Sequence, residues 1–194
     1  MMMTKRGYLK GKLLIAMPSI RGDDFSHSVV FLCDHSAEGA MGLVLNKPAP
    51  ETIFADLIEK LDLGQKPNLV EDNILHMPVM LGGPVKQFQG FVLHSSDYKS
   101  DETLKVSPGF SLTATVDVLR AIAVGHGPKR KLLALGYAGW SAGQLEDEIL
   151  RNGWLTCDAD ADLVFSREPA LKHDMALKKL GVNPGMLSSE AGHA

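Results

Sequence analysis

The chain has 194 residues, of which 45% are hydrophobic and 22% charged, with 19 glycines, 10 prolines and a formal net charge of −3 at pH 7. This composition is typical of an ordinary globular protein and excludes intrinsic disorder, collagen-like repeats and a coiled coil. Two cysteines, Cys33 and Cys157, lie far apart and outside any Cys-x-x-Cys pair. We therefore expect neither a disulfide framework nor a zinc ribbon, and we expect a cytoplasmic location.

Basic and apolar residues follow one another near the N-terminus, as they do in a signal peptide. The apolar run 13–17 ends at Pro18, which makes it shorter than a secretory segment or a membrane helix. We expect a buried strand here and no membrane association. Residues 1–22 carry five basic and no acidic side chains, so the other 172 residues, with 15 basic and 23 acidic, have a net charge of −8. Such a body repels a polyanion, and direct nucleic-acid binding is not the favoured function.

Short β-type segments dominate the first half of the chain. The predicted strands cover residues 13–17, 29–33, 42–45, 74–80 and 90–93, with an edge strand over 103–106. Residues 52–63 place apolar side chains at helical spacing and are followed by Gly64, which predicts an amphipathic helix packed on the sheet.

The second half is more helical. Predicted in order are a helix over about 115–124, a strand over 132–137 after the basic residues 129–131, a helix after Ser141, strands over 154–157 and 163–165, and a helix over 169–180. Ser141 and Gln144 form a Ser-x-x-Gln capping box, which predicts Ser141 as the N-cap of its helix. We interpret the basic triplet 129–131 as the solvated start of a buried strand.

Strands and helices do not alternate strictly along the chain. The pattern therefore favours an α+β fold, with a mixed, strongly curved sheet flanked by about four helices, over a doubly wound parallel sheet. Because no linker or repeat divides the sequence, we predict a single domain over residues 1–187 and a loosely held tail over 188–194.

The segment Gly139-Trp140-Ser141-Ala142-Gly143 matches the Gly-x-Ser-x-Gly nucleophile elbow between a strand and a helix. Several aspartates and then His173 follow in the order of a catalytic triad. However, the preceding chain lacks repeated βαβ units, and His173 lies within a lysine-rich helix. We favour a cap, in which the Ser141 hydroxyl oxygen accepts from the N–H of Gln144, and keep a hydrolase as the alternative.

The histidines of the first half are also candidates for chemistry. Cys33, His35 and Glu38 surround a predicted hairpin tip, where a solvated turn is favoured over a metal site. His94 ends an apolar strand, a common position for a site, but a hydrogen-bonded structural histidine is favoured over a proton-transfer catalyst. We expect no metal and no cofactor.

Glycines and tryptophans complete the candidates. Gly82-Gly83-Pro84 could bind an anion through its backbone, but Pro84 lacks an N–H, so a tight turn or bulge is favoured. Trp140 and Trp154 flank the helix after Ser141 and are interpreted as core anchors.

Several segments together resemble the YqgE/AlgH family of small bacterial proteins, from about residue 8 to about residue 187. They are Gly11–Pro18, Asp24-Phe25 with Ser28-Val29-Val30, Gly39–Pro48, Gly82–Val85, Gly90–Ser95, Leu135–Trp140 with Gly143–Glu146 and Glu148, and Asn152–Leu155. The resemblance implies a compact, cytoplasmic α+β domain whose curved, partly closed sheet is surrounded by helices. Members are often labelled as regulators of transcription in alginate production, but the resemblance implies neither a DNA-binding motif nor a catalytic set.

Our functional hypothesis joins the residues and the resemblance. We expect a polar cleft formed at one end of the sheet by Asp24, Asn46, Gly83, His94 and Trp140. The cleft would bind a small molecule or a peptide and transmit its occupancy to an unidentified partner. One alternative is transcriptional regulation by direct DNA contact through the basic N-terminal segment and residues 129–131. A second is a hydrolase that uses Ser141.

Overall fold

The structure, a computed structural model, describes residues 8–187, so the predicted tail over 188–194 lies outside it. Ten strands are present in this range: β1 Lys12–Ala16, β2 Val29–Ser36, β3 Gly39–Val44, β4 Pro48–Ile53, β5 Pro78–Leu81, β6 Val85–His94, β7 Leu104–Ser107, β8 Phe110–Thr113, β9 Lys131–Ser141 and β10 Trp154–Asp158. The same range contains six α-helices: α1 Phe54–Lys60, α2 Asp72–Leu75, α3 Val116–Ala123, α4 Gln144–Leu150, α5 Ala161–Val164 and α6 Lys172–Lys179.

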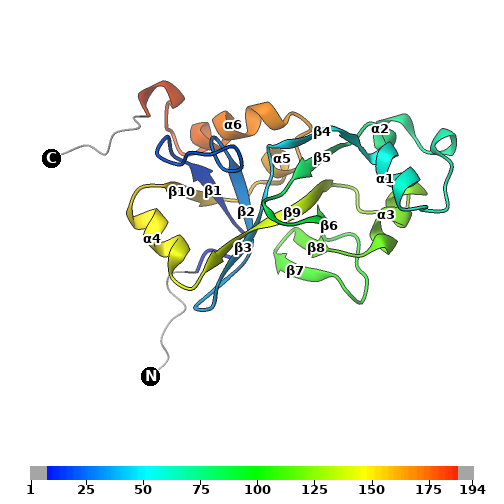
Figure 1. Ribbon diagram of the computed structural model, residues 1–194, viewed down its shortest axis with the longest axis horizontal. Coiled ribbons are helices and arrows are strands. Elements are labelled where there is room, and N and C mark those ends of the chain that lie inside the picture. The colour runs from blue at the N-terminus through cyan, green and yellow to red at the C-terminus, as the bar shows by residue number, and fades with distance from the viewer. Residues whose placement is uncertain (1–7, 188–194) are drawn as a thin grey trace.

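Strand β9 is the centre of the sheet, whose order is β10-β1-β2-β3-β9-β6-β8-β7, with β5 beside β9 and β4 beside β5. The first half of β9 pairs with β6 on one side and with β5 on the other, and its second half pairs with β3. The β5–β9 pair is parallel, in a sheet that is otherwise antiparallel. The sheet curls around an interior (Figure 1). The predicted α+β single domain with a mixed, curved sheet is confirmed, but with six helices in the described range where four were expected.

The continuous apolar runs form strands that are buried on both faces. In β1, Leu13 and Ile15 belong to the interior core, whereas Leu14 and Ala16 join Trp154 in a second core on the outer face. Successive side chains of a strand point to opposite faces, so a run without polar residues requires cover on both sides. This explains why the N-terminal apolar segment is a strand in the protein interior.

Helices supply that cover (Figure 1). Helices α5 and α6 contribute side chains to the interior core, α4 packs on the outer face near β3, β9 and β10, and α1, α2 and α3 pack on the outer face of β5, β6 and β9. Within residues 8–187, no helix is long and apolar enough to cross a bilayer.

Some predicted elements were wrong or incomplete. Residues 163 and 164 are helical, and Phe165 is the C-cap, because the Asp160 side chain accepts from the N–H groups of Asp162 and Leu163 and so starts α5. The predicted strand over 74–80 divides into α2 and β5, and β8 was not predicted. The predicted helix over 52–63 shortens to α1 because its first two residues extend β4.

Candidate functional site

Asp24 lies in the loop that precedes β2, and Asn46, between β3 and β4, contacts the end of the same loop in a structural role. Its Oδ1 accepts from the N–H of Val29 at 2.9 Å, and its Nδ2 donates to the carbonyl of His27 at 2.8 Å. His27 has a φ of 56°, a backbone conformation that needs external support. Asn46 therefore holds the loop in place, while Asp24 lies exposed on it.

Gly83 forms the predicted tight connection, between β5 and β6. A side chain here would collide with the backbone of Tyr137, and its φ is 152°. The N–H of the neighbouring Gly82 donates to the carbonyl of Leu135 at 2.8 Å. The backbone of this turn therefore packs against β9 and hydrogen-bonds to it, which is a structural role.

His94 is fully buried and hydrogen-bonded at both ring nitrogens. Nδ1 contacts the carbonyl of Ser95 at 2.8 Å, and Nε2 contacts Oγ1 of Thr113 at 2.8 Å. A carbonyl only accepts, so Nδ1 carries the proton and Nε2 accepts from the Thr113 hydroxyl. Burial lowers the pKa of His94, although the Ser95 carbonyl and Asp97 act in the opposite direction. The ring is therefore a neutral structural group, as the sequence favoured.

Trp140 belongs to the outer-face core with Trp154, their rings 6.1 Å apart in an edge-to-face arrangement. Both indole N–H groups donate to the same oxygen of Glu148. His94 pairs with the first residue of β9, Lys131, whereas Trp140 is the tenth residue of β9. That separation corresponds to about 30 Å of strand. The structure thus does not bring the five predicted residues into one cleft.

Ser141 is exposed at the end of β9, and the prediction that it caps the next helix was wrong. The N-cap is Gly143, which has a φ of 77°. Both the N–H and the hydroxyl of Ser141 donate to Oε1 of Gln144, at 3.0 and 3.2 Å. His173, the histidine that the hydrolase alternative would require, contacts the carbonyl of Ala16 in a different part of the fold. His173 is therefore not in a position to act as a general base for Ser141.

The predicted hairpin cluster is also structural. His35 Nδ1 accepts from the N–H of Leu9 at 3.0 Å, and Nε2 contacts Glu146 at 2.9 Å, which joins the start of the described chain to α4. Burial raises the pKa of the Cys33 thiol to about 12, so it stays protonated. In residues 8–187, no three His, Cys, Asp or Glu side chains are grouped as metal ligands.

The structure instead contains a groove that the sequence did not predict. It has a volume of about 680 Å³ and lies on the outer face of the sheet, between α1 and α3. We call it the outer groove. Its floor is formed by β5, β6 and β9, and its walls by β4, the two helices and the segment after β8. The lining side chains are mostly apolar: Ala49, Pro50, Leu57, Leu61, Val79, Leu81, Phe88, Phe91, Val92, Val116, Leu119, Leu133, Ala134 and Leu135.

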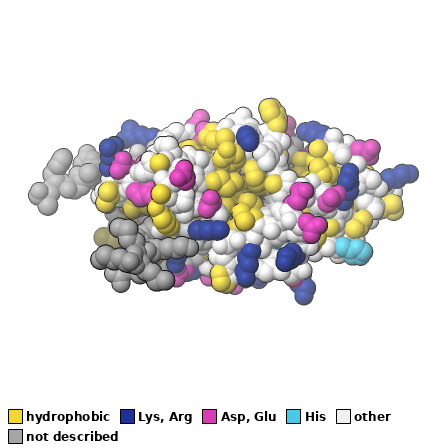
Figure 2. Space-filling model, turned by 90° about the horizontal axis from the view of Figure 1, so that it is seen from below, with side chains coloured by type: hydrophobic (Ala, Val, Ile, Leu, Met, Phe, Trp, Pro, Cys, Tyr) yellow, Lys and Arg dark blue, Asp and Glu magenta, His cyan; other side chains and the backbone are white. Residues whose placement is uncertain are grey.

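Exposed apolar side chains gather in patches on the surface (Figure 2), and several large ones surround this groove. Phe88 is 99% exposed, and Leu61, Leu81 and Val116 are each more than a third exposed. Phe88 lies in the segment 86–89 of β6, where the register with β9 is irregular between the pairs Val85–Tyr137 and Gly90–Leu135. An exposed apolar patch beside an apolar hollow is typical of an interaction site.

Gly90 keeps the floor of the outer groove open. It lies on β6 two residues before Val92, so both face the outer side of the sheet. A Cβ built at Gly90 meets nothing within 4 Å, and its φ is not positive. A glycine inside a strand often marks a place that another molecule approaches closely.

The polar groups of the groove suit binding better than bond cleavage. They are Thr52, Lys60, Gln87, Thr113 and Thr115. Lys60, exposed at the end of α1, is the one charged side chain among the described lining residues. No sequence signal pointed to this site, because its lining comes from six separate segments of the chain.

Comparisons with known proteins agree on one family. The AlgH-like family model (DUF179) matches residues 13–185. A UPF0301 protein of Rhodopseudomonas palustris (strain HaA2) is 57% identical over 190 residues, which covers 96% of this chain and 87% of that protein. A second UPF0301 protein, from Bradyrhizobium diazoefficiens, is 56% identical and covers 97% of this chain and 89% of that protein.

Solved structures show the same arrangement of elements. The solution structure of the AlgH protein from Pseudomonas aeruginosa is similar with a TM-score of 0.77 and 41% identity, covering the whole of both chains. The crystal structure of protein DIP2367 from Corynebacterium diphtheriae has a TM-score of 0.63 and 20% identity, covering 84% of this chain and 83% of that one. The second likeness concerns the fold alone.

Proposed function

The chain belongs to the AlgH-like family, and from that premise we propose that it is a non-catalytic binding protein that holds an amphiphilic small molecule in the outer groove. The observation that carries the proposal is an apolar hollow of about 680 Å³ rimmed by exposed apolar side chains. This volume lies within the roughly 300–1,000 Å³ of small-molecule sites.

The lining defines the chemistry of the ligand. Apolar walls favour an apolar body, and burying it supplies most of the binding free energy. Lys60 at the end of α1 favours a single acidic group at the mouth of the groove. The floor strands β5, β6 and β9 are each paired on both sides, so they offer no free edge to an extended peptide.

The proposal also includes the location of the protein and a regulatory role. We place the protein in the cytoplasm, which is supported by two buried free cysteines. A regulatory role would follow if the occupied groove changes the surface around Phe88 that a partner contacts.

The proposal is tested with a substitution on the floor of the outer groove that fills its space. A Gly90→Leu side chain occupies the space that a ligand needs and adds no backbone strain. We expect the wild type to bind one equivalent of 8-anilino-1-naphthalenesulfonate, an aromatic body with one sulfonate, and Gly90→Leu to weaken binding about tenfold or more. Fluorescence titration gives both dissociation constants.

Gly139→Leu is the matched control. Gly139 is an exposed strand glycine on the far half of β9, where a Cβ has ordinary contact with Tyr137 at 3.6 Å. It should change the affinity by less than about twofold. Equal affinities of wild type and Gly90→Leu would contradict the proposal.

A further inference from the structure

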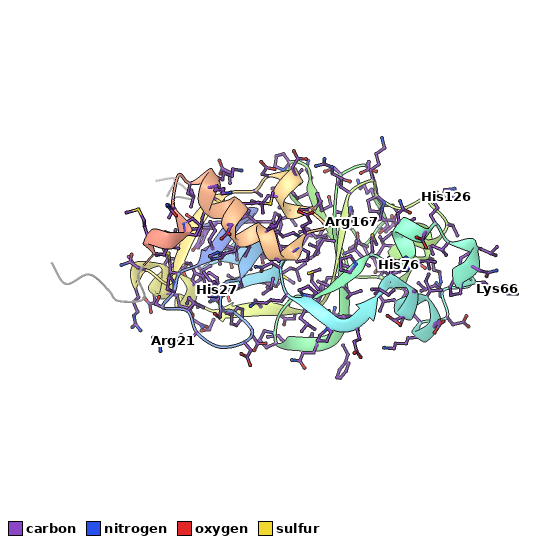
Figure 3. All side chains as sticks on the ribbon, turned by 90° about the horizontal axis from the view of Figure 1, so that it is seen from above. Arg21, His27, Lys66, His76, His126 and Arg167 are labelled. Atoms are coloured by element: carbon purple, nitrogen blue, oxygen red, sulfur yellow. The ribbon has the colours of Figure 1, made fainter. Side chains whose placement is uncertain are left out.

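A second cavity lies on another part of the molecule and has the opposite character. Its volume is about 300 Å³, and it is bounded by the start of β9, the residues that precede it, α5 and the segment after α5. Figure 3 shows Arg167 between α5 and α6 on one side and α1 and α2 on the other. We call this hollow the basic cavity.

Four cationic side chains line the basic cavity: Lys129, Arg130, Lys131 and Arg167. The first three form the basic triplet that we interpreted from the sequence as the solvated start of a buried strand, and the fourth comes from a segment more than thirty residues later. Asp162 is the one acidic side chain among the described lining residues. The fold therefore collects positive charge from two distant segments around one hollow.

Among the described residues, three of these four cations have no carboxylate within salt-bridge distance. Within the described range, Arg130 is the one member with a carboxylate partner, Asp162, at 2.7 Å. Arg167 Nη2 donates to the backbone carbonyl of Asn73 at 2.7 Å, and Lys131 Nζ donates to the carbonyl of Pro128 at 3.1 Å. Carbonyl partners position the two side chains but carry no compensating charge.

The electrostatics of Lys131 agree with this geometry. Burial lowers the pKa of Lys131, and the charge of Arg167 lowers it further, while Asp97 and Glu71 act in the opposite direction. A lysine whose charged form is disfavoured by burial and by a neighbouring cation marks a position where an anion is stabilising. The positive charge of Arg167 thus contributes to the lowered pKa of Lys131.

The remaining lining residues indicate which other groups a ligand of this cavity should carry. Ser166 Oγ accepts from the N–H of Glu168 at 3.2 Å, which leaves its hydroxyl proton for an acceptor in the cavity. Phe165 and Met77 provide an apolar wall. A cavity of this size suits a small molecule with one strongly anionic group and a compact apolar or aromatic body.

We propose that the basic cavity is a binding site for a phosphate monoester of small size, with its phosphate between Lys131, Arg167 and Arg130 and its body against Phe165. Arginine forks match phosphate oxygens in a bidentate way, and each charge-assisted bond is stronger than a neutral one. The site is separate from the outer groove and does not depend on the function proposed for it.

The acidic neighbours argue for a small ligand over a nucleic acid. Asp97, Glu71 and Asp162 carry negative charge near the same cations. A duplex would have to place successive phosphates beside these carboxylates, whereas a single phosphate enters the hollow alone. The body of the chain is also acidic, with a net charge of −8 outside residues 1–22.

The experiment uses adenosine 5′-monophosphate as the probe, with adenosine and inorganic phosphate as comparisons. Isothermal titration with the wild-type protein should give one equivalent of bound nucleotide, with no measurable binding of adenosine and weaker binding of inorganic phosphate. We expect Arg167→Gln and Lys131→Gln each to weaken nucleotide binding about tenfold or more. Arg167 is exposed, so its replacement should leave the thermal unfolding midpoint unchanged.

Lys105→Gln is the charge-matched control, since this exposed lysine on β7 does not line the cavity. It should change the affinity by less than about twofold. Equal weakening by Lys105→Gln, equal binding of adenosine, or no nucleotide binding overturns the proposal. Inorganic phosphate as tight as the nucleotide would indicate a free-phosphate site and overturn it too, as would a short DNA duplex that binds more tightly and is released by Arg167→Gln.

Discussion

Glu148 holds both tryptophans of the chain. Its Oε2 accepts from the indole N–H of Trp140 at 2.9 Å and of Trp154 at 2.8 Å, while its Oε1 accepts from Nε2 of Gln144 at 3.0 Å. The indoles are buried, so each N–H depends on this carboxylate for its hydrogen bond. One side chain of α4 therefore connects the central strand β9 to the edge strand β10.

Replacing Glu148 tests this connection. Glu148→Ala leaves two buried donors without an acceptor, and we expect a loss of about 2–4 kcal/mol in the free energy of unfolding. Glu148→Gln keeps a carbonyl oxygen that can accept from both indoles, so its loss should be clearly smaller. Urea unfolding followed by tryptophan fluorescence measures both. The exposed Asp147→Ala on the same helix should cost less than about 1 kcal/mol, and an equal cost there would contradict the assignment.

Residue roles were predictable where burial decided them. The tryptophans as core anchors and His94 as a structural histidine follow from apolar surroundings. The cap at Ser141 did not follow, because β9 continues through Ser141 and the chain turns at Gly143 in a left-handed conformation. The spacing of Ser141 and Gln144 is that of a capping box, yet the glutamine oxygen accepts both bonds from the serine.

At the scale of elements, α5 shows how one side chain decides between strand and helix. The Asp160 carboxylate accepts from the N–H groups of Asp162 and Leu163, at 2.9 and 3.2 Å. These hydrogen bonds, first of all that from Leu163, hold the pKa of Asp160 below its usual range although burial acts in the opposite direction. Leu163 and Val164 then face the interior core. An apolar run this short gives no periodicity with which to distinguish helix from strand.

Asp160→Ala should destabilise α5 locally. We expect a cost of about 1 kcal/mol, seen as faster hydrogen exchange at the amides of Asp162 and Leu163. Asp160→Asn is the control, because its amide oxygen can still accept and the exchange rates should stay near those of the wild type. If both variants exchange equally fast, charge rather than the cap stabilises the turn.

The same limits explain the other element errors. Long strands buried on both faces were located correctly, since 13–17 and 29–33 overlap β1 and β2. The region 74–80 combines a four-residue helix with a four-residue strand, and each is too short to have its own pattern. The amphipathic helix was found, but its first two predicted residues belong to β4, which pairs with β5 from a distant part of the chain.

At the scale of the whole molecule, the curved mixed sheet was predictable and the two hollows were not. The outer groove exists because α1 and α3 leave part of the sheet uncovered, which depends on how the helices pack. For the basic cavity, the sequence showed the triplet 129–131 but not that Arg167 lies beside it. Sites assembled from distant segments are visible only once those segments are placed in space.

Lys172 connects three parts of the fold from a fully buried position. Its Nζ donates to the carbonyl of Leu45, just after β3, at 3.1 Å and to that of Val164, at the end of α5, at 2.8 Å. A neutral amine has two N–H donors, and these two carbonyls satisfy both. Burial lowers the pKa of Lys172 from 10.5 to about 7.

This pKa makes global stability depend on pH in a specific direction. Between pH 7 and 10.5 the unfolded chain binds a proton at Lys172 that the native state does not, so stability rises with pH, by at most about 1.4 kcal/mol per pH unit. Below pH 7 both states are protonated, and this group adds no further slope. Lys172→Met lacks this slope, so the free energy of unfolding of the wild type should increase relative to that of the variant as the pH rises.

Urea unfolding of both proteins across this range measures the difference in slope, independently of the absolute stability that the variant loses. The exposed Lys178→Met on the same helix is the matched control and should follow the wild-type pH dependence. If the free energies of unfolding of Lys172→Met and the wild type change in parallel from pH 7 to 10, Lys172 stays charged in the native protein. Its contacts with Leu45 and Val164 would then be those of an ammonium group, and α6 would be held to the sheet by a buried charge.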